Sequence, residues 1–263
     1  MRRIALLASL LLTSTAASAA TCGNDAGGFN AWKQAFAQEA AAQGVGQRGL
    51  DALANTQYAT RTINADRNQK SFRYSLDEFL RIRGADTIVA QGRKKIAANP
   101  NFYSALEQRY GVPPSVVVAI WGMETGFGNF MGDSNVVSAI ATLAYDCRRS
   151  DFFSPHAMAA LQLVDRGSLS AGTVGAMHGE VGHTQFLPGN VVRYGVDGDG
   201  NGVVDLTNQV DALASTANFL RQKGWQPGAG FQEGQPNFAV IQQWNAAGVY
   251  QKAIAQMAGQ IDG

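Results

Sequence analysis

The chain is poor in the residues on which many enzyme classes depend. It contains only 2 cysteines and 3 histidines among 263 residues. The histidines, His156, His178 and His183, lack the spacing of a zinc site with a suitable carboxylate. No G-x-S-x-G nucleophile elbow and no G-x-x-x-x-G-K-[ST] phosphate loop is present. These absences exclude zinc hydrolases, elbow-type serine hydrolases and P-loop nucleotide hydrolases.

Net charge and long apolar runs are also scarce. The 21 basic and 20 acidic residues give a formal charge of +1, so nothing indicates a nucleic-acid partner. The longest apolar run, Ile4–Leu12, is too short to span a bilayer. Arg2 and Arg3 precede this run and Ala17–Ala19 follows it, which predicts a signal peptide over residues 1–19. Without the two arginines the formal charge becomes −1.

The two cysteines are Cys22 and Cys147. An exported protein meets an oxidising compartment, so we expect a disulfide between them that ties the N-terminal arm to the segment after residues 135–145. Cys22 also raises the alternative of a lipoprotein anchor. Thr21 fits poorly before an acylation site, so we expect a periplasmic protein without an anchor.

Most of the chain predicts helix, and few strand signals are present. About 244 residues remain after the signal peptide, enough for one domain with a substantial core. Residues 57–70 predict a loop or a small irregular subdomain, and glycine-rich loops are expected over residues 167–182 and 195–202. The helices are expected around Phe29, Trp32 and Phe36, over Ser71–Ile82 and Thr87–Ala98, up to Tyr110, over Asn135–Tyr145, from an N-cap at Ser154 with Pro155 first to Arg166, from Asn208 to Gly224, and over Val249–Ile261.

Val112–Gly132 places one carboxylate at the end of an apolar helix. Pro113 and Pro114 suit a first helical turn, and the following residues leave almost no polar face, so the helix should be buried. Glu124 comes at its end, before the helix-breaking run Thr125–Gly128. Desolvation and the negative end of the helix dipole favour a protonated acid, which is what glycosidic-bond cleavage requires. The alternative is a glutamate whose charge simply reaches water.

Residues 197–206 have the pattern of the first part of a calcium loop. Glycine stands at position 6, and position 12 is Asn208 instead of the usual bidentate glutamate. Asp211 can close a longer loop or support the start of the next helix. We expect a structural Ca²⁺ or Na⁺ that holds the loop in place. The expected ligands are Asp197, Asp199, Asn201, the carbonyl of Val203, and Asp211.

A third motif is the loop GHTQFLP, residues 182–188, in which Gln185 lies among aromatic and apolar residues. A glutamine in such a loop can hold a sugar hydroxyl or N-acetyl group. A purely structural amide is an equal alternative.

Together these segments resemble the membrane-bound lytic murein transglycosylase B family, which cleaves peptidoglycan strands and has a lysozyme-like core. The collinear motifs that carry the resemblance are YGVPPSVVVAIWGMETGFG, GHTQFLP, YGVDGDGNGVVDL, VDALASTANFLRQKGW and QQWN, with Tyr250 six residues after Trp244. The resemblance covers nearly all of residues 67–263. It implies a single mainly α domain over residues 20–263, with the acid and the metal loop in a core of about residues 112–211.

The resemblance also implies roles for individual residues. Glu124 matches the catalytic acid, and Asp211 is favoured over Asn208 as the last metal ligand. Trp244 stands where the family carries a tyrosine. The aromatic residues would stack on sugar faces or belong to the core. The implied substrate-binding residues are Gln185, Phe127, Phe219, Trp244, Asn245 and Tyr250.

Two positions depart from the family pattern. Ala176 replaces a serine near the catalytic acid, so another group, His183 or a water, would have to take over that serine's role. Glu180 replaces a small residue. A second carboxylate near Glu124 would change its pKa, unless Glu180 lies in solvent.

The implied activity is cleavage of the bond between MurNAc and GlcNAc without water, which leaves a 1,6-anhydro ring. Glu124 would act first as acid and then as base, and no cofactor would enter catalysis. Two alternatives stay open: a hydrolytic muramidase that uses Glu180 as the second carboxylate, and a non-catalytic peptidoglycan-binding protein. The expected partner is the glycan strand, bound by a monomer. Whether cell-wall or secretion-machinery proteins also bind is left open.

Overall fold

The computed structural model describes residues 20–68 and 74–263. The expected signal peptide lies outside the described residues. Short strands β1 and β2 pair antiparallel, with Ser134 opposite Gly175. The elements are η1 (Ala26–Gly28), α1 (Phe29–Ala42), α2 (Gln47–Ala54), α3 (Thr60–Arg67), α4 (Leu76–Arg83), α5 (Ala85–Ala98), α6 (Pro100–Tyr110), α7 (Pro114–Thr125), β1 (Ser134–Asn135), α8 (Val136–Tyr145), α9 (Ser150–Arg166), β2 (Val174–Gly175), α10 (Pro188–Tyr194), α11 (Gln209–Gln222), α12 (Phe238–Trp244) and α13 (Gly248–Asp262).

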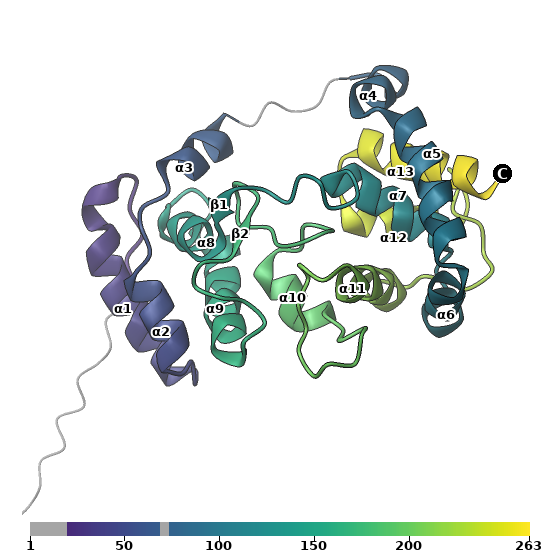
Figure 1. The fold of residues 1–263 in the computed structure, drawn as a ribbon. Helices are drawn as coiled ribbons and strands as arrows, with labels where there is room; N and C mark the ends of the chain where they lie inside the picture. Colours follow the sequence, from purple (N-terminus) through teal and green to yellow (C-terminus); the bar gives the residue numbers. More distant parts are fainter. Residues whose placement is uncertain (1–19, 69–73) are drawn as a thin grey trace, which may run out of the picture.

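The helices form two packed groups joined by α10 and α11 (Figure 1). Helices α1, α2 and α3 pack with α8 and α9 in one group. Helices α4, α5 and α6 pack with α7, α12 and α13 in the other, so the C-terminal helices lie beside a segment from the first half of the chain. Helix α10 contacts α9 and helix α11 contacts α7, which connects the groups.

Helix α7 is the centre of the second group. Pro113 and Pro114 occupy its N-cap and first position, and almost every residue up to Met123 is buried. Helices α5 and α13 pack along it. Its burial follows from the apolar run in the sequence, because a helix that is apolar on all sides must be covered on all sides. The C-terminal end of α7, which carries Glu124, is therefore held in a fixed position.

The N-terminal arm is fastened to the end of α8. Cys22 and Cys147 form a disulfide, as expected. The backbone N–H of Gly23 donates to the carbonyl of Tyr145, and the carbonyl of Gly23 accepts from the N–H of Cys147. A Cβ at residue 23 would lie 2.0 Å from the Tyr145 hydroxyl, so only glycine allows this close approach.

A buried carboxylate connects α3 to the start of α9. Asp66 is almost fully buried and forms ion pairs with Arg148 and Arg149. Two guanidinium groups on one carboxylate satisfy its acceptors, which makes its burial tolerable. The interaction fixes α3 within the first group.

Helix boundaries agree with most expectations and differ in three places. Helix α9 begins at Ser150, so Pro155 lies inside it and not at its first position. Burial of Phe153 and the ion pair of Arg149 favour this earlier start. Pro155 has no N–H to donate to the carbonyl of Asp151, but Asp151 is exposed, so water can bond to that carbonyl instead. The segment over residues 57–70 contains helix α3. The helix expected from residue 71 begins at residue 76, and residues 71–73 lie outside the described residues.

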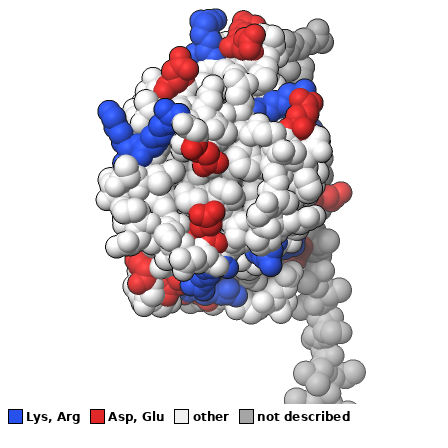
Figure 2. All heavy atoms as spheres, turned by 90° about the vertical axis from the view of Figure 1, so that its right-hand side faces the viewer, with Lys and Arg blue, Asp and Glu red and all other residues white. Residues whose placement is uncertain are grey.

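The surface in Figure 2 shows basic and acidic side chains scattered among a larger area of other residues. This face therefore offers no extended patch of one sign to a polyanion. Among residues 20–68 and 74–263, no helix is both long enough and apolar enough to cross a membrane.

The disulfide gives a stability prediction. We expect the Cys22→Ser/Cys147→Ser variant to lose about 3 kcal/mol of unfolding free energy, because the bond closes a loop of 125 residues in the unfolded chain. Urea unfolding followed by circular dichroism measures this difference. The wild type under reducing conditions should match the variant, and equal midpoints for oxidised wild type and variant would contradict the prediction.

Candidate active site

Glu124 is held by two hydrogen bonds from the C-terminal part of the chain. Trp244, at the end of α12, donates from Nε1 to Glu124 Oε1 at 2.8 Å. Tyr250, in the first turns of α13, donates its hydroxyl to the same oxygen at 2.7 Å. Both bonds fall on Oε1, so Oε2 accepts neither of them, and Glu124 lines a cleft.

Burial is the main influence on the protonation of Glu124. It raises the pKa of this carboxyl above its usual value of 4.5, and the hydrogen bonds from Trp244 and Tyr250 oppose that rise. The nearby charge of Glu180 raises the pKa further, while Arg83 lowers it. Burial and the shifted pKa favour the protonated acid over the alternative of a glutamate whose charge simply reaches water.

Tyr250 remains a proton donor at neutral pH. Burial and the charge of Glu124 raise the pKa of its hydroxyl well above 10.0. Its ring is buried and lies near Phe79, with 6.0 Å between the ring centroids. Tyr250 therefore orients the carboxylate through its hydroxyl, and its ring is not part of the cleft lining.

Thr125 connects the end of α7 to the loop that contains Gln185. Its hydroxyl donates to the carbonyl of His183 at 2.6 Å and accepts from the backbone of Gly128 at 2.9 Å. Trp121 Nε1 donates to His183 Nδ1 at 3.1 Å. Of the two groups suggested for the missing serine's role, a water and His183, the His183 imidazole packs on Trp121, and the groups that hydrogen-bond to Glu124 are Trp244 and Tyr250.

A cleft of about 310 Å³ opens in front of Glu124. It contains four of the residues expected to bind substrate, together with two amides, Asn190 and Gln243, that sequence reasoning missed. The amides carry no pattern of their own, because they become neighbours only when α10 and α12 pack. The lining residues are Glu124, Ala176, His178, Glu180, Gln185, Phe186, Leu187, Asn190, Phe219, Gln243, Trp244 and Asn245.

Aromatic rings form one wall of this cleft. Trp244 packs edge-on against Phe186 and Phe219, with 5.2 Å between the centroids in each pair. Phe219 also packs on Tyr194. This cluster fixes the indole in the orientation that its hydrogen bond to Glu124 requires. Rigid aromatic walls are also suited to the apolar faces of sugar rings.

Gln185 and Phe127 share an unusual backbone conformation. They are the non-glycine residues of the described chain with positive φ, at 56° and 64°. Gln185 Nε2 donates to the carbonyl of Gly182 at 2.7 Å, so part of its amide has a structural role. Phe127 does not join the cleft with Gln185, because its ring packs edge-on against Trp121. Strained residues of this kind cluster at functional sites, and both flank Glu124.

Glu180 and Ala176 lie in the cleft together with Glu124. Glu180 is half-buried, so the alternative in which it lies in solvent is wrong. Its Oε2 is buried without a hydrogen-bond partner among the described residues, and His178 Nδ1 lies 3.9 Å from Oε1. The cleft therefore contains a second carboxylate, but the small side chain of Ala176 provides no hydroxyl in place of the missing serine.

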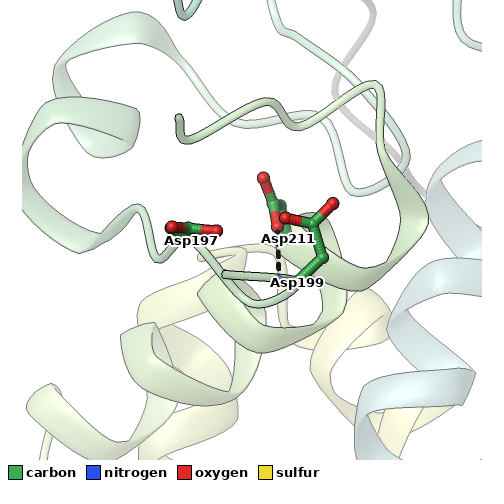
Figure 3. A group of neighbouring side chains, drawn as sticks. All are labelled: Asp197, Asp199 and Asp211. Carbon is green, nitrogen blue, oxygen red and sulfur yellow. Dashed lines mark hydrogen bonds between the residues drawn. The ribbon is translucent and has the colours of Figure 1, made fainter. Parts of the chain in front are cut away.

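Three carboxylates gather where the loop before α11 meets the first turn of that helix (Figure 3). Oxygens of Asp197, Asp199 and Asp211 lie within 4.8 Å of one another. Asp211 is fully buried and accepts from the backbone of Gly198, Asp199 and Asp205. Three hard oxygen donors at this spacing fit a cation such as Ca²⁺.

The other expected ligands of this loop have different surroundings. Asn201 Oδ1 accepts from the backbone of Val203, which is exposed. Asn208 caps α11 and donates to Asp199 Oδ2 at 2.7 Å, so its amide supports a carboxylate of the cluster. Backbone N–H groups, first that of Gly202, lower the pKa of Asp197. These N–H groups favour the ionised form of Asp197, and the cluster closes on the buried Asp211.

Comparison with known proteins assigns the family. Residues 28–233 match the family model described as the transglycosylase SLT domain. The chain belongs to this family. It is 37% identical over 123 residues to membrane-bound lytic murein transglycosylase B of Escherichia coli K12, which is 46% of this chain and 34% of that protein. The match thus spans about a third of the curated relative's length.

Solved structures of the family confirm the mainly α, lysozyme-like fold. SltB3 of Pseudomonas aeruginosa, solved with NAG-anhNAM-pentapeptide, superposes with a TM-score of 0.83 at 29% identity, over 89% of this chain and 80% of that chain. Slt35 of Escherichia coli, solved with calcium, superposes with a TM-score of 0.77 at 23% identity, over 92% and 96%.

The raised pKa of Glu124 predicts a pH-dependent effect on stability. The carboxyl of Glu124 loses its proton near pH 4.5 in the unfolded chain and at a higher pH in the folded chain. The contribution of this proton to the free energy of unfolding is therefore fully present below pH 4.5 and is lost as pH rises through the folded pKa. Each tenfold difference in proton affinity between the folded and unfolded chains corresponds to about 1.4 kcal/mol. Glu124→Gln keeps an acceptor for Trp244 and Tyr250 without the charge. We expect it to melt above the wild type at about pH 8 and close to it at about pH 4.

Differential scanning calorimetry across this pH range measures the difference. Asp133→Asn, at an exposed carboxylate paired with Arg61, is the matched control and should show no such trend. A melting difference for Glu124→Gln that stays constant with pH would contradict the prediction.

Proposed function

We propose that this chain is a lytic murein transglycosylase, which cleaves the β-1,4 bond between MurNAc and GlcNAc without water. The observation that carries the proposal is the carboxyl of Glu124, desolvated at the cleft, with Oε1 bound by Trp244 and Tyr250. A single acid held in this way can serve as donor through Oε2. The activity named for the Escherichia coli relative and the NAG-anhNAM product bound to SltB3 support the same reaction.

In the first step Glu124 donates its proton to the glycosidic oxygen, which leaves as the 4-hydroxyl of GlcNAc. Burial favours the protonated acid before the step, and the Trp244 and Tyr250 hydrogen bonds stabilise the carboxylate after it. Positive charge develops at C1 of MurNAc, where the oxygen of the 2-acetamido group can stabilise it. No residue of the chain needs to attack C1.

In the second step the Glu124 carboxylate removes the proton from the 6-hydroxyl of the same MurNAc. The freed oxygen attacks C1 and closes the 1,6-anhydro ring. Glu124 is then protonated again, and no water has been consumed. Exclusion of water from C1 favours this outcome, and the rigid wall formed by Phe186, Phe219 and Trp244 supports such exclusion.

Amides of the cleft are suited to hold the sugars. Gln185, Asn190 and Gln243 come from three separate segments and share the cleft with Glu124. Neutral donors and acceptors match the hydroxyl and N-acetyl groups of the glycan. Gln185 is expected to hold the sugar next to the scissile bond, as its match to the family motif implies.

A hydrolytic muramidase is the second candidate function, and one observation favours it. Glu180 brings a second carboxylate into the cleft, and conventional glycosidases use two. Glu180 would then take a proton from water, and the product would end in reducing MurNAc. Anhydro and reducing ends differ by one water in mass, so product analysis distinguishes the two reactions.

We also propose that the protein acts as an exported, monomeric enzyme of the periplasm. The substrate lies outside the cytoplasm, and the charged, apolar and small-residue pattern of residues 1–19 suits export. The Cys22–Cys147 disulfide supports an oxidising compartment.

The activity prediction concerns Glu124→Gln. We expect purified wild type to release 1,6-anhydro muropeptides from murein and the variant to lose at least about 100-fold in rate, because glutamine cannot donate a proton. Mass spectrometry of the soluble products measures both rate and end group. Asp133→Asn is the control and should retain full activity.

Three outcomes would contradict this proposal. Full activity of Glu124→Gln would remove the acid from the mechanism. Reducing ends from the wild type would replace it with the hydrolytic reaction. Binding to murein with no soluble fragment would favour a non-catalytic protein.

We further propose that the Asp197–Asp211 loop binds a structural Ca²⁺. The ligands would be Asp197, Asp199 and Asp211 with Asn201 and the carbonyl of Val203. The cation would neutralise the gathered carboxylates and hold the loop against α11. It has no part in the chemistry at Glu124.

Calcium binding should be visible as stabilisation. We expect millimolar Ca²⁺ to raise the melting temperature of the wild type through mass action, and Asp211→Asn to abolish this rise. Fluorimetric melting with and without a chelator measures it, with Asp133→Asn as the matched control. An equal rise in Asp211→Asn and wild type would contradict the site.

A further inference from the structure

A second groove, of about 490 Å³, lies beside Glu124 and is distinct from the cleft that holds Gln185. Its walls come from the end of α4, the start of α5 and the segment after α7. Glu124 lines both cavities, so a substrate at the catalytic carboxyl can extend into either of them. Nothing in the mechanism above uses the second groove.

The groove combines exposed apolar side chains with one cation. Ile82 is 51% exposed and Phe130 is 78% exposed, although both are large apolar residues that normally avoid water. Arg83 is the basic residue among those that line the groove. The amides of Gln91 and Asn129 line the same groove and can bond to a peptide backbone.

Arg83 is the cation among the described residues that line this groove, and no carboxylate among the described residues pairs with it. Its guanidinium stacks over the Phe79 ring at 5.3 Å, and it forms no ion pair with a carboxylate within residues 20–68 and 74–263. It lowers the pKa of both Glu124 and Tyr250, so its charge acts on the catalytic carboxyl. A fixed, stacked guanidinium is suited to bind a carboxylate of a ligand.

The chemistry of the substrate limits what this ligand can be. The glycan of peptidoglycan is neutral, because the lactyl carboxyl of MurNAc is joined to the peptide as an amide. Carboxylates are found only on the peptide stem, next to short aliphatic side chains. The cleft with Gln185 carries Glu180 and disfavours an anion, whereas the second groove offers a cation with apolar neighbours.

We propose that the groove formed by Ile82, Arg83 and Phe130 binds the peptide stem of the MurNAc beside the scissile bond. Arg83 pairs with a carboxylate of the stem, and Ile82 and Phe130 cover its aliphatic side chains. The assignment rests on the proposed function, and it makes Arg83 a specificity residue that distinguishes stem-bearing from stem-free glycan.

The test compares two substrates for each protein. Glycan strands are prepared with their stems intact and with the stems removed by an amidase. The lactyl carboxyl that the amidase frees is converted to a simple amide, so that the stem-free glycan is neutral, and kcat/KM is measured on both substrates. We expect the ratio of stem-bearing to stem-free rates to fall about fivefold in Arg83→Met, the effect of one partly exposed charge-assisted contact. Any change in the pKa of Glu124 affects both substrates and cancels in the ratio.

Arg81→Met is the matched control. Arg81 is exposed on the same helix but lines a different cavity with Asp77 and Gln256. It should keep the wild-type ratio. Phe130→Ser should lower the ratio as Arg83→Met does. An unchanged ratio in Arg83→Met, or an equal fall in Arg81→Met, would overturn the proposal.

A binding measurement separates this proposal from the proposed function. Calorimetry with Glu124→Gln, which cannot turn over, compares GlcNAc-MurNAc-pentapeptide with GlcNAc-MurNAc whose lactyl carboxyl is converted to a simple amide. We expect the peptide to strengthen binding, and Arg83→Met in this background to remove most of the gain. Equal affinities for the two ligands would overturn the groove assignment even if cleavage is confirmed. An increase in affinity that comes from the peptide and depends on Arg83 would support the groove assignment even if the wild type cleaved nothing.

Discussion

The site depends on the hydrogen bonds that Trp244 and Tyr250 donate to one oxygen of Glu124. Helix α7 supplies the carboxyl and buries it, and the C-terminal helices α12 and α13 supply the donors. Burial raises the pKa of the acid and the two donors oppose the rise, so the two influences on the carboxyl act in opposite directions. A group that must first give and later take a proton requires this balance.

The rest of the fold serves to keep that arrangement rigid. The aromatic rings of Phe186 and Phe219 fix the indole of Trp244, and Thr125 fixes the end of α7 to the Gln185 loop. Two non-glycine residues with positive φ mark the two sides of the acid. The metal loop lies before α11, so a cation there would stabilise the helix that carries Phe219. Catalytic geometry is thus maintained by contacts among four separate segments.

The sequence predicted what depends on local pattern. The apolar run before Glu124 required burial of α7, the two cysteines left one pairing, and the alternating oxygen ligands located the cluster at Asp197. It failed where distant contacts decide. Pro155 predicted the start of a helix, but α9 begins at Ser150, because Phe153 and Arg149, which precede Pro155, have tertiary partners. The second groove and the roles of Trp244 and Tyr250 as donors arise only when α13 packs on α7 and α4 and α12 pack on α13. No local signal encodes that packing, or the place of Glu180 in the cleft.

Helices α12 and α13 are the last of the described elements to be synthesised, and this delays completion of the site. Trp244 and Tyr250 follow Glu124 by 120 and 126 residues. At about 5–20 residues per second, the acid exists for roughly 6–25 seconds without either donor. A partly made chain therefore carries the acid but not the support that orients it. A chain truncated before Trp244 would likewise keep the acid and lose both donors, so the orientation of Glu124 depends on residues more than a hundred positions after it.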